Sequence, residues 1–422
     1  MPRLPLLVIG GLGILAVIVI AAVFGIGRRE AAPAAATIEF WGVEDERVWR
    51  SAFQLLHETK PHLTIKYRRL DEAAYETTLV NRLAEGRGPD VFVLKNSWIK
   101  KHRDKLFPFP ADFFKISVRS LIAPLADGPA EEVVTAEGEL LGLPLFVDSP
   151  VLLYNKDLFN AAGIAEFPRT WDDFAAAAKK LTTNTPAGDI IKSGAALGTY
   201  REIAYGFDIL SSFFLQHGDP VVNRATGAPV LQREAKDALE RYTSFANPAS
   251  EHFSWSARFG NSLDAFVEER TAIAVGKVGD IPRARSRNPH LNVGVLAFPQ
   301  LKEARTPVVY GEYFFPVVSN QSKNKAAAWE FVIFLGSAEG TGAYVKESAR
   351  APARRDLLAA GAPSSDLEPV YRQALISRGW PVPDEAAVSR LFEQAVESVI
   401  VRRGTPERAI ADLREKMELL LR

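Results

Sequence analysis

The chain has 422 residues, 47% of them hydrophobic and 24% charged, which is typical of a folded protein long enough for about two domains. Its 51 basic and 51 acidic side chains balance, and no basic stripe stands out, so nucleic acid is not expected as the main partner. The absence of cysteine excludes disulfides, thiolate nucleophiles, cysteine-ligated metals and lipid attachment through an N-terminal cysteine.

The N-terminal segment is strongly apolar, since residues 4–27 contain no charged side chain. As a helix this segment would span about 36 Å, enough for a bilayer core of roughly 30 Å. Signal peptides have shorter apolar regions of about 7–15 residues, so we favour an uncleaved membrane anchor carrying an extracytoplasmic soluble part. The small residues of "APAAAT", 32–37, keep a second reading open, in which cleavage near Ala36 releases a secreted or periplasmic protein.

Strand-like and helix-like segments alternate after an alanine-rich linker that ends at Ala36. Two amphipathic helices are expected, the first ending before Pro61 and the second at Gly86. They separate three strands, expected at residues 37–42, 63–70 and 89–94. This order predicts βαβ units and a largely parallel sheet.

The same kind of pattern restarts after Asp148. "TWDD", residues 170–173, fits a capping box that opens a helix. From Asn324 onward the pattern is mostly helical. Further strands are expected at residues 151–155, 271–275, 293–298 and 313–318. Two α/β lobes are therefore predicted.

Catalytic motifs are present only in fragments. The letters of a dinucleotide fingerprint at residues 11–16 lie inside the apolar N-terminal run, not between a strand and a helix. Residues 271–279 resemble a phosphate loop but lack its first glycine and its hydroxyl residue. The six histidines are scattered, and no serine sits in a nucleophile elbow. Nothing in the sequence requires an enzyme, a metal or a cofactor.

Asp148 is unusual because apolar residues flank it on both sides in "LPLFVDSPVLLY". A carboxylate taken out of water costs several kcal/mol unless something pairs with it. Either Asp148 contacts a ligand, or it pins the chain through a lysine, an arginine or backbone N–H groups. We favour ligand contact, because an intruding charge often has a functional reason.

Five segments, in this order, carry a resemblance to a known family: "TIEFWG", "LAEGRGPDVFVLKNSW", "GLPLFVDSPVLLYNKDLFNAAGI" followed by "PRTWDDFAAAAKKLT", "AFVEERTAIAVGKVGD" and "PVVSNQSKNKAAAWEFVIFL". Together they resemble family 1 of the bacterial extracellular solute-binding proteins, the sugar receptors of ABC importers. The third segment is the most specific, since its order, spacing and flanking helix match together. The resemblance covers nearly the whole chain after the linker.

The resemblance implies an α/β fold of the type II periplasmic-binding-protein kind, with two lobes joined by crossing hinge segments. Residues 37–147 and 292–316 would form lobe 1, and residues 148–291 and 317–422 would form lobe 2, after an anchor and linker at residues 1–36. It also implies capture of a sugar or oligosaccharide by hinge closure and its delivery to an ABC permease. No cofactor or metal is implied, ATP would be hydrolysed on another polypeptide, and we expect a monomer.

Candidate ligand contacts follow from the resemblance and from position, because ligands of open α/β sheets bind beyond the carboxyl ends of strands. The candidates are Trp41, Gly42, Asn96, Trp98, Asp148, Tyr205, Trp255, Lys277, Gly311, Glu312 and Tyr313. Tryptophans could stack on sugar rings, although Trp98 could equally belong to the core. Lys277 and Glu312 could pair with one another instead of binding ligand, and the choice between Tyr200 and Tyr205 stays open.

Two rival functions remain at this point. A glycosidase-like enzyme could use Asp148 and Glu312 if their carboxyl groups lay about 5–9.5 Å apart across a bond. A ligand sensor could keep the fold without transport. The solute is also undetermined, since acidic cleft residues suit sugar hydroxyls but also a cationic ligand such as a polyamine or a basic peptide.

Overall fold

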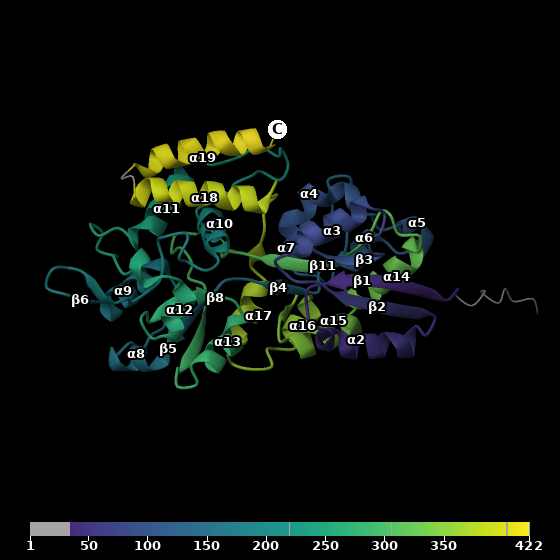
Figure 1. Ribbon diagram of the computed structural model, residues 1–422, viewed down its shortest axis with the longest axis horizontal. Coiled ribbons are helices and arrows are strands. Elements are labelled where there is room, and N and C mark those ends of the chain that lie inside the picture. The colour runs from purple at the N-terminus through teal and green to yellow at the C-terminus, as the bar shows by residue number, and fades with distance from the viewer. Residues whose placement is uncertain (1–33, 219, 305, 402–403, 422) are drawn as a thin grey trace, which may run out of the picture.

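The computed structural model describes residues 34–421 except 219, 305 and 402–403. The expected anchor at residues 4–27 lies outside the described residues. Within the described part of the chain, no helix combines the length and apolar character needed to cross a bilayer. Two lobes lie side by side along the long axis of the molecule (Figure 1), each built from a sheet with helices packed around it.

The sheet of the first lobe has six strands in the order β12-β4-β11-β3-β1-β2 in the described chain. Strand β1 runs parallel to β2 and β3, as expected from the βαβ pattern. Strand β11 runs antiparallel to both β3 and β4, so the expectation of a largely parallel sheet is wrong beyond the first three strands. The bounds are Ala36–Gly42 for β1, Leu63–Arg69 for β2, Val91–Lys95 for β3, Phe146–Asp148 for β4, Glu312–Val318 for β11 and Ala351–Pro352 for β12.

Helices from both halves of the sequence cover this sheet. The amphipathic helix α2 buries Trp49, Ala52 and Leu56 and packs against α15, although some 280 residues of chain separate the two helices. The helices of this lobe are α2 (Glu46–Thr59), α3 (Tyr75–Ala84), α4 (Ile99–His102), α5 (Ala111–Phe114), α6 (Val118–Ile122), α7 (Asp127–Glu132), α14 (Lys325–Gly336), α15 (Ala338–Ser348) and α16 (Arg355–Ala359).

The second lobe is built on a smaller sheet of order β8-β5-β9, in which β5 is antiparallel to both neighbours. Its central strand is fully buried, as the continuous apolar run predicts. The strands of this lobe are β5 (Val151–Asn155), β6 (Thr183–Asn184), β7 (Ile190–Lys192), β8 (Ile273–Gly276) and β9 (Val293–Ala297). Its helices are α8 (Lys156–Ala161), α9 (Trp171–Leu181), α10 (Gly206–Gln216), α11 (Arg233–Ser244), α12 (Ser262–Val267), α13 (Asp280–Arg287), α18 (Glu385–Ile400) and α19 (Pro406–Leu421).

The capping box predicted at Thr170 is present. The Thr170 side chain accepts a hydrogen bond from the Asp173 N–H, and the Asp173 carboxylate accepts one from the Thr170 N–H. These two bonds satisfy backbone donors that the first turn of a helix leaves free, which is why α9 begins at Trp171. The helix then buries Trp171 and Phe174 in the core of the second lobe, to which it belongs.

The chain passes between the lobes directly after β4, again between β9 and β11, and a third time after α16. Short strands β10 (Val309–Tyr310) and β13 (Ser377–Arg378) pair in parallel in these crossings, and α17 (Glu368–Ala374) contacts both β4 and β9. Helices α18 and α19, coloured yellow, lie together over α10 and α11 (Figure 1). The C-terminal helices therefore belong to the second lobe.

The predicted lobe boundaries need correction in two places. Strand β9 was assigned to lobe 1 as part of residues 292–316, but it pairs with β5 in the sheet of the second lobe. Residues 317–359 were assigned to lobe 2, but β11 pairs along its whole length in the first sheet, and α14 and α15 pack on that lobe. Both errors have one cause, because the strand partners are far apart in sequence and local patterns do not reveal them.

Candidate functional site

Two adjoining cavities of about 420 and 580 Å³ open between the lobes. Glu312 and Phe314 line both cavities from the first lobe, and Tyr205 and Lys277 line both from the second. Each volume falls in the range typical of small-molecule sites. The cavities therefore form one cleft with a wall from each lobe, which we call the inter-lobe cleft.

Strand ends place the charged side chains in this cleft. Asp148 ends β4, Lys95 ends β3 and Lys277 directly follows β8. Glu312 begins β11 and is the register partner of Asp148, since the two strands are antiparallel. The edges of both sheets thus meet at the cleft, as expected for ligand sites of α/β proteins.

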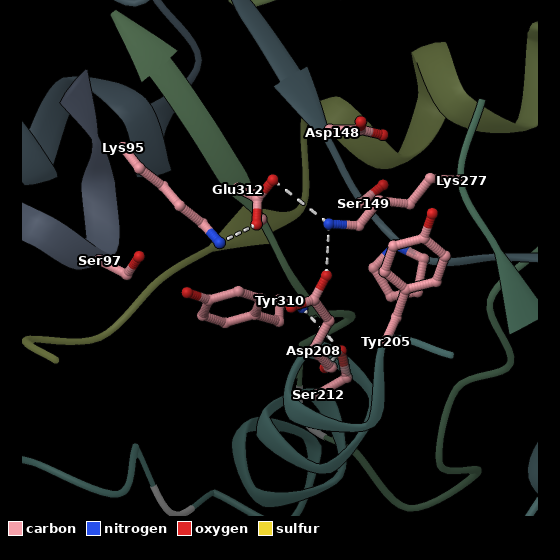
Figure 2. Close-up of polar contacts among 12 residues, drawn as sticks. Lys95, Ser97, Asp148, Ser149, Tyr205, Asp208, Ser212, Lys277, Tyr310 and Glu312 are labelled. Carbon is pink, nitrogen blue, oxygen red and sulfur yellow. Dashed lines mark hydrogen bonds and ion pairs between the residues drawn. The ribbon is translucent and has the colours of Figure 1, made fainter. Parts of the chain in front are cut away.

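A chain of ion pairs runs through the cleft from one lobe to the other. The Lys95 ammonium lies 2.5 Å from Oε2 of Glu312, and the Lys277 ammonium lies 3.3 Å from Oε1 of the same carboxylate. Lys277 also lies 2.6 Å from Oδ2 of Asp208 on α10. Figure 2 shows the Lys277 ammonium between Glu312 and Asp208. Glu312 belongs to the first lobe and Lys277 to the second, so this pair joins the lobes.

Burial and mutual attraction set the protonation of these groups. Burial raises the pKa of Asp208 to about 6, against the pull of Lys277. Burial would also raise the pKa of Glu312, but Lys277 and Lys95 lower it to about 2. Burial would lower the pKa of Lys277, yet Asp208 and Glu312 hold it well above its ordinary value. At neutral pH all of these groups are therefore ionised.

Asp148 has a partner of its own, Arg350, which lies 202 positions further along the chain. Nη1 of Arg350 donates to Oδ2 of Asp148 at 2.8 Å, and its Nε lies 3.2 Å from Oε1 of Glu44. The guanidinium stacks over the Phe146 ring at 4.3 Å. The other oxygen of Asp148, Oδ1, is buried and accepts no hydrogen bond from the described residues. Asp148 is thus both pinned by an arginine and left with one unused acceptor.

The N-terminal end of α18 closes one side of the cleft. Glu385 lies 2.8 Å from the Lys95 ammonium and accepts a hydrogen bond from Ser97. Lys101, also in the first lobe, lies 2.8 Å from the carboxylate of Asp384. The C-terminal helices of the second lobe are thereby tied to the first lobe by charge.

Half-buried aromatic rings face the same space. Trp98 and Tyr200 line the larger cavity, and Trp98 stacks on Tyr75 at 6.2 Å between ring centroids. Tyr205 lines both cavities, with the Lys277 ammonium 4.8 Å above its ring and its hydroxyl donating to Asp280 at 2.8 Å. Its φ of 61° lies in the left-handed region, a strained conformation for a tyrosine. The cleft therefore offers flat apolar faces beside its charges.

The structure brings Trp98, Asp148, Tyr205, Lys277 and Glu312 together in the cleft, as the sequence analysis expected. Lys277 and Glu312 also pair with one another, which was the stated alternative. Tyr200 and Tyr205 both line the larger cavity, and Tyr205 lines the smaller cavity as well, so both are positioned to face a ligand there.

Three residues predicted to contact ligand lie outside the two cavities, because their side chains are packed in the core. Trp41 is 1% exposed and lies under the guanidinium of Arg68. Trp255 is fully buried, and its indole N–H donates to Oγ1 of Thr199. Tyr313 is fully buried in β11 beside β4. None of the three lines either cavity.

The remaining three candidates shape the cleft from behind. The Asn96 side chain donates to the Gly311 carbonyl at 3.0 Å and accepts from the Tyr313 N–H at 3.1 Å, which fixes the backbone on both sides of Glu312. A Cβ on Gly311 would come within 2.7 Å of Ser377, and one on Gly42 within 2.9 Å of the Tyr67 hydroxyl. The two glycines thus allow close packing. Asn96, Gly42 and Gly311 line neither cavity, and their contact with ligand stays a prediction.

Sequence reasoning missed Glu44, Asp208, Arg350 and Glu385. Asp208 could have been predicted from the sequence, because it is the single charged residue in the apolar helix "GFDILSSFFLQ". A charge on an otherwise apolar helix commonly marks a buried pair or a site. Arg350 could not have been predicted, since it lies in a short loop among other arginines.

Over residues 42–342 the sequence matches the family described as bacterial extracellular solute-binding protein. This chain belongs to that family. The match confirms the resemblance drawn from the five segments.

Among the described residues, no group of three or more acidic or histidine side chains could hold a metal ion.

Curated relatives of this solute-binding protein span most of its length. One is the "Probable amino-acid ABC transporter periplasmic-binding protein y4oP" of Sinorhizobium fredii, 24% identical over 365 residues that cover 82% of this chain and 80% of that protein. The "Multiple sugar-binding protein" of Streptococcus mutans is 20% identical over 317 residues, 73% of each chain.

A solved structure agrees on the fold. The cyclic α-maltosyl-1,6-maltose binding protein from Arthrobacter globiformis matches with a TM-score of 0.77 at 16% identity, covering 92% of this chain and 99% of that one. The two-lobed α/β periplasmic-binding-protein fold expected from the sequence is thereby confirmed.

Proposed function

We propose that this solute-binding protein is the extracytoplasmic receptor of an ABC importer and that it captures a sugar or oligosaccharide in the inter-lobe cleft. Ligand would enter an open form, bridge both walls and stabilise the closed form by contacts that exist only there. Delivery to a membrane permease would follow. A micromolar dissociation constant requires about 8 kcal/mol net, within reach of two aromatic stacks and several polar bonds.

The observation that carries this proposal is the mixture of unused polar atoms and aromatic faces in one cleft. Among the residues that the structure describes, Oδ1 of Asp148 is a buried acceptor without a donor, and Nε1 of Trp49 is a buried donor without an acceptor. Both residues line the smaller cavity. A hydroxyl group can serve either atom, since it donates and accepts. Trp98 and Tyr200 would receive the apolar face of a sugar ring. Names of relatives that include "Multiple sugar-binding protein" support the same class of ligand.

Glycoside hydrolysis is less well supported by the geometry. Asp148 and Glu312 are register partners on adjacent strands, so they stand side by side on one wall and do not face each other across a bond. Lys95 and Lys277 hold Glu312 ionised, so it is not a proton donor at neutral pH. We propose a binding protein and not an enzyme.

For the N-terminal segment we propose the role of a tether. An apolar helix at residues 4–27 would keep the receptor beside its permease and raise the local concentration without any new contact. Cleavage near Ala36 would instead give a secreted or periplasmic receptor. Mass spectrometry of the protein isolated from both the membrane and the extracytoplasmic fractions of its native cells separates these two forms, because only the tethered form contains residues 4–27.

Calorimetry and thermal unfolding with a panel of neutral mono- and oligosaccharides test the receptor function. A binder present at a hundredfold excess over its dissociation constant stabilises the protein by about 2.7 kcal/mol. Trp98→Ala should weaken that binder by roughly tenfold through loss of the stacking face. A permease partner is expected to co-purify with the receptor, whereas a signalling partner in its place would favour the sensor. Steady release of product from a chromogenic glycoside would overturn the proposal in favour of an enzyme.

A further inference from the structure

We propose that the solute is a saccharide bearing a protonated amino group and that Asp148 receives this ammonium group. The proposal rests on the carbohydrate-receptor function above and narrows its substrate class. It starts from the distribution of charge in the inter-lobe cleft and from the unused oxygen of Asp148.

The cleft is acidic although the whole chain is balanced. Nine carboxylates and six cationic side chains line the two cavities, a surplus of three negative charges. The acidic residues are Glu44, Asp45, Glu72, Asp148, Asp208, Glu312, Glu347, Glu385 and Glu393, and the basic residues are Arg69, Lys95, Arg201, Lys277, Arg283 and Arg350. A cleft lined by one sign of charge raises the local concentration of solutes of the opposite sign.

The cations deep in the cleft are already occupied. Lys95 lies between Glu312 and Glu385, and Lys277 lies between Glu312 and Asp208. Arg350 contacts two further carboxylates. An anionic solute would therefore find each of these three cations engaged, and it would meet the repulsion of five carboxylates.

The exposed arginines at the rim are engaged as well. Arg69 lies 3.6 Å from Asp45, and Arg283 lies 3.5 Å from Asp280. Arg201 contacts Glu393 and lies 3.2 Å from Glu397. Among the described residues, every cationic side chain that lines the cleft has an acidic neighbour. The cleft therefore keeps its surplus of negative charge.

Asp148 is the buried lining carboxylate that combines an arginine partner with one oxygen left without a hydrogen bond from the described residues. Its side chain is buried, it lines the smaller cavity, and Oδ1 accepts no hydrogen bond from the described residues. Burial raises the pKa of Asp148, Arg350 and Lys277 oppose the rise, and repulsion from Glu312 and Asp280 adds to it. A buried carboxylate oxygen without a donor is unfavourable, because the hydrogen bonds that it made to water in the unfolded chain are not replaced.

An ammonium group would satisfy the unused oxygen of Asp148 and offset the negative charge around it. It donates a hydrogen bond to Oδ1 and adds the positive charge that the neighbouring carboxylates lack, and charge-assisted bonds are about twice as strong as neutral ones. A hydroxyl supplies the bond without the charge. The same pocket therefore distinguishes an amino sugar from its hydroxyl counterpart. Asp148 is only 6% exposed, so the ligand must reach it when the lobes open.

Calorimetry on the full-length protein in mild detergent at pH 7 tests this preference directly. The probes are glucosamine and the β-1,4-linked glucosamine dimer, each compared with its hydroxyl counterpart, glucose or cellobiose, and with its neutral N-acetyl form. Spermidine provides a cation without sugar hydroxyls. We expect the amino form to bind at least tenfold more tightly than both neutral forms and more tightly than spermidine.

Variants assign the preference to Asp148. Asp148→Asn keeps the shape of the side chain and removes its charge, so the ratio between amino and neutral forms should fall to within about twofold. Glu44→Gln, on the half-buried loop after β1, should lower the ratio in the same direction and provides a second reading should Asp148→Asn fail to fold. Asp412→Asn makes the same charge change on an exposed position of α19 and should leave the ratio unchanged.

The outcomes separate this inference from the function on which it rests. If a neutral sugar binds as tightly as its amino form, or if Asp148→Asn weakens both forms equally, the amino preference is overturned and the carbohydrate receptor stands. If spermidine binds more tightly than every saccharide, the saccharide class itself is overturned. If no sugar binds in either form, the receptor function fails together with the inference.

Discussion

Glu312 pairs with two buried lysines through one carboxylate, and each lysine has one further acidic partner, Glu385 for Lys95 and Asp208 for Lys277. Its two oxygens lie 2.5 Å from Lys95 and 3.3 Å from Lys277. All three side chains are largely removed from water, where charges interact more strongly than at the surface. Removing one partner of a buried ion pair lowers the free energy of unfolding far more than replacing both partners with apolar residues, because it leaves a buried charge without a partner.

Glu312→Gln should therefore lower the free energy of unfolding by about 3 kcal/mol, since the amide leaves each lysine with one carboxylate in place of two. Urea unfolding at pH 7 measures this loss. Glu418→Gln is the matched control, because it removes an exposed partner of Arg414 and should cost about 0.5 kcal/mol or less. Equal effects of the two substitutions would contradict the assigned importance of the buried pair.

Glu132 is a buried carboxylate outside the cleft, and for this residue the effect of burial on the pKa outweighs that of its polar neighbours. It accepts from Asn96 and from the Gly379 N–H, and Arg224 approaches only to 3.8 Å. Burial dominates and raises its pKa from 4.5 to about 7. The folded protein thus holds this proton more tightly than the unfolded chain, so the contribution of Glu132 to stability is lost as pH rises from about 4.5 to 7.

Glu132→Gln should consequently become favourable relative to the wild type as pH rises, because the amide never ionises. The difference in unfolding free energy between the variant and the wild type should rise by roughly 3 kcal/mol between pH 4.5 and 8. Urea titrations of both proteins across this range provide the measurement, and taking the difference cancels groups common to both. A difference that stays constant with pH would show that Glu132 titrates normally.

At the scale of elements, the beginning of α18 combines a helix cap with a contact between lobes. The Asp384 side chain accepts from the Ala387 N–H at 2.8 Å and lies 2.8 Å from the ammonium of Lys101 in the first lobe. One carboxylate thus satisfies a backbone donor of the helix and a charge across the cleft. The two roles can be separated because only one of them needs Lys101.

Asp384→Ala should lower the free energy of unfolding by about 1–2 kcal/mol, since it removes both the cap and the pair. Lys101→Gln removes this pair and a second one with Glu76 at 2.9 Å but keeps the cap, so its cost should be about 1 kcal/mol or less. Chemical denaturation of both variants gives the comparison. Should Asp384→Ala cost less than about 0.5 kcal/mol, the helix cap would carry no stability of its own.

Elements were more predictable than their partners. The expected strand at 63–70 matches β2 and the helix ending before Pro61 matches α2, because local periodicity reports which face of each element is buried. The lobe assignment of β9 failed because pairing with β5 is a contact between distant segments. Arg350 was missed for the same reason, since nothing near it in sequence points to Asp148.

Candidate site residues divide along a similar line. Asp148 and Lys277 were predictable, because a charge at the end of a buried strand has few places to go except the cleft. Trp41 also follows a strand pattern, but a tryptophan is compatible with either face, and here it points into the core. The position of an apolar aromatic side chain therefore cannot be predicted without knowing its three-dimensional neighbours. The position of a charged side chain is easier to predict, because burying a charge without a partner is unfavourable.

For the molecule as a whole, the feature that matters is that charge holds the two lobes together across an otherwise open cleft. Lys277 with Glu312, Lys95 with Glu385 and Lys101 with Asp384 each join one lobe to the other. If the lobes open about the segments that cross between them, these pairs favour the closed form. We infer that ligand binding adds to an existing bias toward the closed form.

Lys95→Gln should shift the ligand-free protein toward the open form, because Glu312 and Glu385 then repel one another across the cleft. The chain has no cysteine, so Arg87→Cys in the first lobe and Glu251→Cys in the second provide two specific spin-label sites, both about 74% exposed. Pulsed electron resonance should show longer inter-lobe distances for Lys95→Gln than for the labelled parent. Lys416→Gln, whose ammonium contacts Gln394 within the second lobe, should leave the distances unchanged. If Lys95→Gln gives the distances of the parent, the pairs do not hold the lobes, and closure must depend on ligand alone.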